Sequence, residues 1–183
     1  MRSFIAIDFD RELKTRIAGL QSEIRRYAVS GRWKHIDNFH LTLKFLGEIN
    51  PNSVENINRI LAGICSSFSP FKLSFSTLGY FPGQEKIRVL WLGLEGDLDK
   101  LLCFQKTIDA GLKEEGFEPE KRRFTPHVTI GQDIVLNSVF ESIMRLVDPK
   151  ELPEIRVRSI YLFKSEQINF KRIYTPISEF CLI

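Results

Sequence analysis

The sequence predicts an α+β protein whose sheets are largely antiparallel, and three observations lead to this fold class. Along the 183 residues, segments whose apolar residues recur at every second position alternate with segments whose apolar residues have helical spacing. Several strand segments follow one another after short connections, as the strands of hairpins do. The pattern His-apolar-Thr-apolar also occurs twice, at His40–Leu43 and at His127–Ile130. Because the two copies lie 87 residues apart, close to half the chain, one expectation is an internal duplication that gives two similar lobes.

The first part of the chain reads as strand, helix, strand and helix. Residues 4–9 form the first strand, and Asp10 offers an N-cap for a helix that Ser30-Gly31 ends. Residues 39–46 form a strand that carries the first motif. Asn50, followed by a proline, then starts a second helix with its apolar residues on one face.

The rest of the chain continues this mixture. Residues 71–75 alternate apolar and polar side chains, which predicts a half-buried strand, and residues 80–83 predict a turn before a more buried strand over 86–94. A helix is expected over 97–115, and Gly116 stops it. The remaining expected elements are the second motif strand, a helix over 138–147 and strands over 155–163 and 173–181.

Composition indicates an ordinary single domain over residues 1–183. Hydrophobic residues make up 43% of the chain, and no apolar run approaches the roughly 20 residues of a membrane span. Cys65, Cys103 and Cys181 are scattered within apolar stretches, so we read them as buried thiols of a reduced compartment. We therefore expect a cytoplasmic monomer that makes no contact with a membrane. The net charge of +3 permits contact with a polyanion without demanding it.

The two motifs carry the clearest chemistry. Alternate side chains of a strand share a face, so each His projects with its Thr while the apolar pair packs behind. The same alternation places Lys44 on the face of the first motif and Gly131 on the face of the second. Two imidazoles can act as acid and base near neutral pH, and hydroxyls donate to anionic oxygens. These residue types predict a phosphoester-cleaving site without a metal, formed by His40, Thr42, His127 and Thr129.

These residues also have less specific interpretations. A single His-x-Thr-x segment is usually a half-exposed strand with a structural histidine, but two of the three histidines share this context. His35 lies outside both motifs and is expected to be structural or exposed. The triplet Lys121–Arg123 precedes the second motif, and it is either a solvated loop or the source of an arginine that faces substrate. Zinc-ligand spacing, glycine-rich phosphate loops and the Gly-x-Ser-x-Gly elbow are absent from the sequence.

The stretches His40–Glu48 and Arg123–Ile130 resemble the two signatures of the 2H phosphoesterases. More narrowly, they are similar to those of bacterial and archaeal RNA 2′,3′-cyclic phosphodiesterases, first described as 2′-5′ RNA ligases. Similar stretches also occur at residues 4–7, 78–82 and 89–93. The resemblance therefore spans nearly the whole chain, and its motifs are specific in their order and spacing.

This resemblance implies a bilobal fold with two mainly antiparallel sheets, flanking helices, a pseudo-twofold axis and an active cleft between the lobes. It also implies hydrolysis of an RNA 2′,3′-cyclic phosphate end to a 2′-phosphomonoester without a cofactor, with 2′-5′ ligation as a possible reverse activity. By analogy with the family, His127 is the general base that activates water and His40 is the general acid that protonates the departing 3′ oxygen. Thr42 and Thr129 would hold the non-bridging oxygens.

One departure from the family pattern concerns the residue five positions after the second histidine. Family members commonly carry an arginine there, whereas this chain has Gln132. Phe45 stands at the matching position after the first histidine and is expected to stack on the terminal base, although strict alternation places it on the opposite face from His40. Clamping of the base would then be weaker, or it would use Arg122 or Arg123.

Three functions from different classes therefore stay open. The leading one is an RNA 2′,3′-cyclic phosphodiesterase. A second is a 2H-type phosphodiesterase that acts on a small cyclic or 2′,5′-linked nucleotide, which the departure at Gln132 favours. A third is a module that binds RNA ends without turnover, but binding alone does not need two titrating groups.

Overall fold

The structure is a computed structural model that describes residues 1–183, with nine strands, four α-helices and four short 3-10 turns. The strands are β1 (Arg2–Asp8), β2 (Ala28–Trp33), β3 (His40–Glu48), β4 (Phe71–Pro82), β5 (Ile87–Gly96), β6 (His127–Leu136), β7 (Ile155–Val157), β8 (Ser159–Ile168) and β9 (Lys171–Cys181). The helices are α1 (Arg11–Arg25), α2 (Val54–Cys65), α3 (Leu98–Gly111) and α4 (Phe140–Met144). The 3-10 turns are η1 (Ile36–Asn38), η2 (Pro51–Ser53), η3 (Lys113–Glu115) and η4 (Pro149–Glu151).

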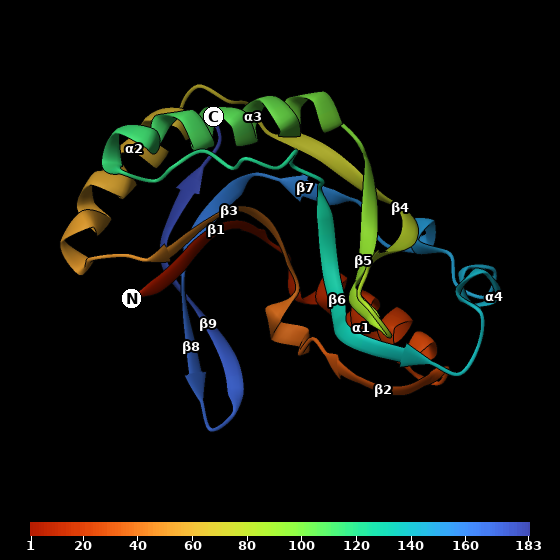
Figure 1. The fold of residues 1–183 in the computed structure, drawn as a ribbon. Coiled ribbons are helices and arrows are strands. Elements are labelled where there is room, and N and C mark those ends of the chain that lie inside the picture. The colour runs from red at the N-terminus through yellow and green to blue at the C-terminus, as the bar shows by residue number, and fades with distance from the viewer.

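All nine strands belong to one antiparallel sheet, in the order β7-β4-β5-β6-β3-β1-β8-β9, with β2 paired to β6. At its centre β3 and β6 are joined through the pair Leu41 and Val128. The two expected sheets thus meet along the motif strands and curl as one (Figure 1). The predicted α+β fold with two mainly antiparallel lobes is confirmed.

The two sides of this junction repeat the same arrangement. On one side β1 lies beside β3 and is followed by α1, and on the other side β5 lies beside β6 and is followed by α3. Each helix also contacts the motif strand of the opposite side, because Gln21 of α1 bonds to β6 and Gln105 of α3 bonds to β3. Figure 1 shows α2 and α3 together along one edge of the molecule, with the β8–β9 hairpin projecting away from them.

Local sequence signals explain where the helices begin and end. The Asp10 side chain accepts a hydrogen bond from the backbone N–H of Leu13 at 2.8 Å and so caps α1, as expected. Asn50 caps η2, the turn that leads into α2. After α3 the short turn η3 ends at Gly116, whose φ is +84°. Glycine adopts this left-handed conformation without steric cost.

Several expected boundaries were wrong. Residues 28–33 form β2 instead of the end of a helix, because this segment pairs with β6. Residues 80–82 continue β4 instead of turning, since they pair with residues 87–90 of β5. The strand expected over 155–163 is divided into β7 and β8, which pair with different partners, β4 for the first and β1 and β9 for the second.

Most of the core is one cluster of 36 buried residues drawn from both lobes, and Phe4, Ala6 and Phe163 form a second, smaller cluster. The expectation of three buried thiols was wrong in part, because Cys65 is buried whereas Cys103 and Cys181 are exposed. Cys103 lies in α3 and Cys181 lies in the edge strand β9. Each of these elements has a face that is exposed to solvent, and the cysteine lies on that face. No helix in the structure combines the length and the apolar character that a membrane span requires.

Candidate active site

Both motif histidines stand at the first position of their strand, one residue before the pair that joins β3 to β6. The apolar partners Leu41 and Val128 are fully buried, whereas the histidines and the threonines Thr42 and Thr129 are half-buried on the opposite face. The predicted alternation therefore holds over both motifs. Pairing of the two strands brings these two faces together at one place in the sheet.

The two imidazoles are oriented in the same way. Nδ1 of His40 lies 2.8 Å from the carbonyl oxygen of Asn38, and Nδ1 of His127 lies 2.7 Å from that of Thr125, in each case two residues earlier. A carbonyl oxygen can only accept, so Nδ1 carries the proton and Nε2 of each neutral ring keeps its lone pair. Nε2 of His40 then accepts from the Thr42 hydroxyl at 3.0 Å.

The surroundings favour the neutral form of both rings. Burial lowers the pKa of His40 from 6.5 to about 3, the charges of Lys34, Lys14 and His127 act in the same direction, and the bond to Asn38 opposes them. Burial also lowers the pKa of His127, although its bond to Thr125 raises it. The charge of His127 also lowers the pKa of His40, as the smallest of the contributions.

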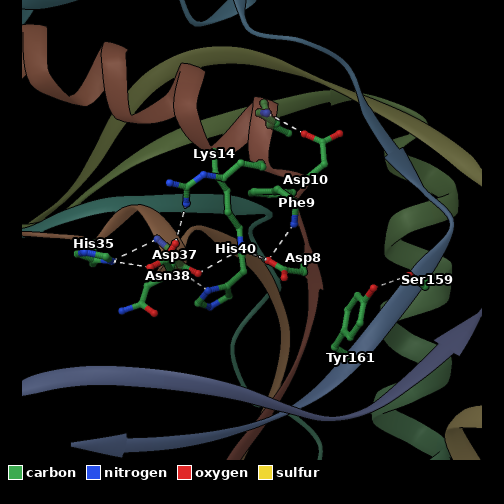
Figure 2. Close-up of polar contacts among 12 residues, drawn as sticks. Asp8, Phe9, Asp10, Lys14, His35, Asp37, Asn38, His40, Ser159 and Tyr161 are labelled. Carbon is green, nitrogen blue, oxygen red and sulfur yellow. Dashed lines mark hydrogen bonds and ion pairs between the residues drawn. The ribbon is translucent and has the colours of Figure 1, made fainter. Parts of the chain in front are cut away.

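Two lysines outside the motifs lie close enough to His40 for their charges to act on it. Lys14 of α1 forms an ion pair with Asp8 at 2.7 Å and donates to the carbonyl oxygen of Asp37 at 3.2 Å, next to the His40–Asn38 bond (Figure 2). Lys34 donates to the Tyr174 hydroxyl at 3.2 Å. Neither lysine lies at motif spacing from His40, so only the folded chain reveals them. The charge of Lys14 is offset by Asp8, so Lys34, which pairs with no carboxylate, is the cation near His40 that favours an anionic ligand.

Aromatic rings line both sides of the pair. The His40 ring lies 4.9 Å from that of Phe4 and 5.2 Å from that of Tyr174. The His127 ring lies 5.1 Å from that of Phe81. Such rings exclude water from the histidines, and this desolvation is the main cause of the lowered pKa values.

Beyond the first motif the predicted alternation is wrong. The register with β1 passes from Thr42 directly to Lys44 and leaves Leu43 without a partner, which is a β-bulge. The bulge reverses the faces that follow. Lys44 is buried, 2% exposed, and its ammonium group bonds to the Asp109 carboxylate and to the carbonyl oxygen of Glu118, at 3.0 Å in the second case.

Phe45 consequently turns to the face of His40. Its side chain is 63% exposed, and its ring lies 6.2 Å from that of Phe4, which in turn contacts His40. The bulge therefore makes the Phe45 side chain accessible on the side of the histidines, whereas strict alternation would have placed it on the opposite face.

The second motif strand has a matching bulge. The register with β5 passes from Thr129 to Gly131 and leaves Ile130 without a partner, again three residues after the histidine. Gly131 is therefore buried, against the expectation that it shares the face of the motif, and Gln132 turns to that face, half-buried. No hydrogen bond or ion pair holds the Gln132 side chain, so its amide is free to meet a ligand.

Arg122, Arg123 and His35 make no hydrogen bond, ion pair or ring contact with the two motif histidines. Arg122 and Arg123 are exposed in the loop before β6 and make no hydrogen bond or ion pair, so nothing directs them to the histidines. His35 lies in the turn before β3, where its ring accepts from the backbone N–H of Asp37. No group of three or more His, Cys, Asp or Glu side chains forms a possible metal site.

Comparison with protein families gives a match over nearly the whole chain. The model described as LigT like Phosphoesterase matches twice, over residues 7–91 and over residues 92–174. Each match contains one of the two motifs.

Curated relatives of similar length are also found. The chain is 29% identical over 185 residues to the RNA 2′,3′-cyclic phosphodiesterase of Methanothermobacter thermautotrophicus, covering 100% of this chain and 99% of the relative. It is 31% identical over 179 residues to the protein of the same name from Thermotoga maritima, covering 98% and 94%.

Solved structures share the fold. E. coli LigT complexed with 3′-AMP superposes with a TM-score of 0.82 at 24% identity, covering 99% of this chain and 97% of that one. The protein TT0787 of Thermus thermophilus superposes with a TM-score of 0.77 at 22% identity, covering 100% and 98%. At this level of identity the likeness shows the bilobal fold alone.

Proposed function

Because the chain belongs to the LigT-like phosphoesterase family, we propose that it hydrolyses the 2′,3′-cyclic phosphate at RNA 3′ ends to a 2′-phosphomonoester without a metal ion. The observation that carries the proposal is the matched pair of histidines. Each has Nδ1 bound to a backbone carbonyl, so Nε2 is the atom that can transfer a proton; Nε2 of His127 has no protein partner, and that of His40 contacts only the Thr42 hydroxyl. The proposed substrate comes from the names of relatives that match over nearly their whole length.

In the proposed mechanism His127 is the general base. Its Nε2 makes no hydrogen bond to the protein, and its lowered pKa keeps the ring neutral near pH 7. It therefore takes a proton from the water that attacks phosphorus. The bond from phosphorus to the 3′ oxygen breaks, and the 2′ oxygen keeps the phosphate.

His40 is the general acid that delivers a proton to the departing 3′ oxygen. In the free protein its pKa is about 3, chiefly because of burial and then because of Lys34 and Lys14. A bound phosphate anion would offset these cations and pair with the charged ring, and both effects raise the pKa of His40; the mechanism requires this rise to charge the ring when substrate is present. The hydroxyls of Thr42 and Thr129 would donate to the non-bridging oxygens, where charge builds up in the transition state.

The decisive experiment compares oligonucleotides that end in a 2′,3′-cyclic phosphate with mononucleotide cyclic phosphates and ADP-ribose cyclic phosphate, each with EDTA present. We expect turnover of the oligonucleotide with a 2′-phosphate as the sole product. Loss of turnover on chelation, restored by one divalent metal, contradicts the metal-free mechanism. A 3′-phosphate product contradicts the assigned leaving group.

A second candidate function rests on Gln132. This half-buried, uncharged side chain is one of the two positions that the bulges turn to the face of the histidines. An amide binds the edge of a base but lacks the charge and the stacking plane of an arginine. A small cyclic or 2′,5′-linked nucleotide would then be the better substrate, and the same panel with a 2′,5′-linked dinucleotide added decides between the two.

A further inference from the structure

Two buried glutamines occupy equivalent places in the two halves of the molecule. Gln21 lies on α1 and Gln105 on α3, and these residues are only 9% and 4% exposed. A buried amide is costly unless it is hydrogen-bonded, so its partners indicate why it is there.

Each glutamine bonds to the bulge of the motif strand in the other half. Nε2 of Gln21 donates to the carbonyl oxygen of Ile130 at 2.7 Å, and Nε2 of Gln105 donates to that of Leu43 at 3.3 Å. Leu43 and Ile130 are the residues that the bulge after each motif leaves without a partner. A bulge disrupts the ladder at this point, so its carbonyl needs donors from elsewhere. The Ile130 carbonyl oxygen also accepts from the backbone N–H of Lys34 at 3.0 Å, and Gln21 also donates to the Lys34 carbonyl oxygen at 2.9 Å.

We infer that Gln21 and Gln105 are positioning residues for substrate recognition: each holds one bulge and thereby keeps Gln132 or Phe45 on the face of the histidines. Gln105 acts on Phe45 through Leu43, and Gln21 acts on Gln132 through Ile130. The assignment is crossed, because each helix controls the motif strand of the opposite half. It rests on the proposed function only in taking Phe45 and Gln132 as contacts to substrate.

The consequence of losing a glutamine follows from the bulge. Without Gln105 the Leu43 carbonyl oxygen loses its side-chain donor, and without Gln21 the link between Ile130 and Lys34 is lost. Each motif strand can then shift at its bulge, and this movement alters the face on which the next two residues lie. Lys44 is anchored on the buried side by Asp109, so β3 would distort locally instead of sliding as a whole. The histidine and the threonine precede the bulge and keep their places. Substrate binding should therefore suffer more than the chemical step.

The test is a set of double-mutant cycles on a cyclic-phosphate oligonucleotide. Gln105→Met and Gln21→Met remove the donor while keeping an unbranched side chain of similar length, so the core stays filled. Each is combined with Phe45→Ala and with Gln132→Ala. The exposed Gln84, changed to Met, serves as the matched control.

We expect Gln105→Met to raise KM roughly 3-fold or more with a smaller change in kcat. This increase should vanish in the Phe45→Ala background and persist in the Gln132→Ala background. Gln21→Met should show the reverse pattern. A purely structural role would instead give effects that are the same in both backgrounds, and that result overturns the inference.

Amide hydrogen exchange of the intact chain gives a readout that does not depend on activity. Gln105→Met should speed exchange at residues 43–46 more than at residues 130–133, and Gln21→Met should do the opposite. If the wild type fails to hydrolyse cyclic phosphates, the proposed function fails while exchange still tests the crossed assignment. Equal protection of both segments in the two variants refutes it.

Discussion

Leu41 of β3 and Val128 of β6 face each other as the pair that joins the two motif strands, one residue after each motif histidine. Both side chains are fully buried, so a slip of one residue would move an apolar side chain to the outer face and a histidine into the core. The hydrophobic core thereby sets the register that brings His40 and His127 together. Stability and the proposed catalysis depend on the same contact.

Replacement of either motif histidine by alanine should lower kcat at least about 100-fold, the usual contribution of a positioned acid or base. Both rings are half-buried at the start of a strand, so the fold should survive. His35→Ala is the matched control and should keep near-normal turnover, because His35 lies outside the pair. A folded His40→Ala or His127→Ala protein with a near-normal rate would exclude the paired mechanism.

The rate should fall on both sides of a pH optimum, because one imidazole must be neutral while the other is protonated. The profile of kcat/KM reports the free enzyme, in which the pKa values of both histidines are lowered. The profile of kcat reports the complex, in which the phosphate anion raises the pKa of His40. We therefore expect the basic limb of kcat to lie at higher pH than that of kcat/KM. A kcat that reaches a plateau without falling at high pH rules out His40 as the acid of the rate-limiting step.

His40 should also make stability depend on pH in a defined direction. Its pKa is about 3 when folded and about 6.5 when unfolded, so between these values the unfolded chain binds more protons. Its contribution to stability is complete above pH 6.5 and is lost as the pH falls towards 3. Urea unfolding at about pH 7.5 and about pH 4.5 should show a smaller loss for His40→Asn than for the wild type. Equal losses would show that His40 keeps an ordinary pKa in the folded chain.

The motifs predict the face of each strand only as far as regular alternation lasts. His40, Thr42, His127 and Thr129 lie where the sequence places them, because the buried leucine and valine beside them obey a period of two. Phe45 and Gln132 lie beyond a bulge, and each bulge is held by a glutamine distant in sequence, on the helix of the other half. No local pattern encodes such a contact, so Lys44 and Gly131 were placed on the wrong face.

The element boundaries that the sequence missed have a similar origin. Residues 28–33 are mostly exposed and have no strand-like alternation of apolar side chains, yet they form β2 by pairing with β6. That pairing is a tertiary contact between segments far apart in the sequence, and such contacts override local propensity. The helices were predicted better because their caps and apolar spacing are local.

The buried pair of Lys44 and Asp109 should contribute strongly to stability. The Lys44 side chain is 1% exposed and that of Asp109 14%, and the carboxylate also accepts from the backbone N–H of Glu120 at 3.0 Å. Asp109→Ala leaves a buried ammonium group without its counter-charge, which should lower the free energy of unfolding by about 3–5 kcal/mol in urea titrations.

Two further variants control this measurement. Glu154→Ala removes an exposed carboxylate that pairs with Lys72 at 3.0 Å, and it should leave the urea concentration of unfolding nearly unchanged. The double change of Lys44→Met with Asp109→Leu should recover much of the loss, since no charge is then left buried. If Asp109→Ala unfolds at the urea concentration of the wild type, the pair does not hold the loop before β6.

Recognition of RNA should sit at the terminal nucleotide, through Phe45 and the two threonines. Phe45→Ala should raise KM by an amount that corresponds to about 1–3 kcal/mol of lost stacking, with a smaller effect on kcat. With a net charge of only +3, few phosphates are neutralised, so KM should change little between two salt concentrations. Phe170→Ala is the matched control, because this ring is 97% exposed at the tip of the β8–β9 hairpin. Gln132→Arg should tighten binding if a guanidinium group can complete the contact that the amide makes poorly. A Phe45→Ala protein that binds like the wild type would remove Phe45 from the site, and the bulge in β3 would then need another explanation.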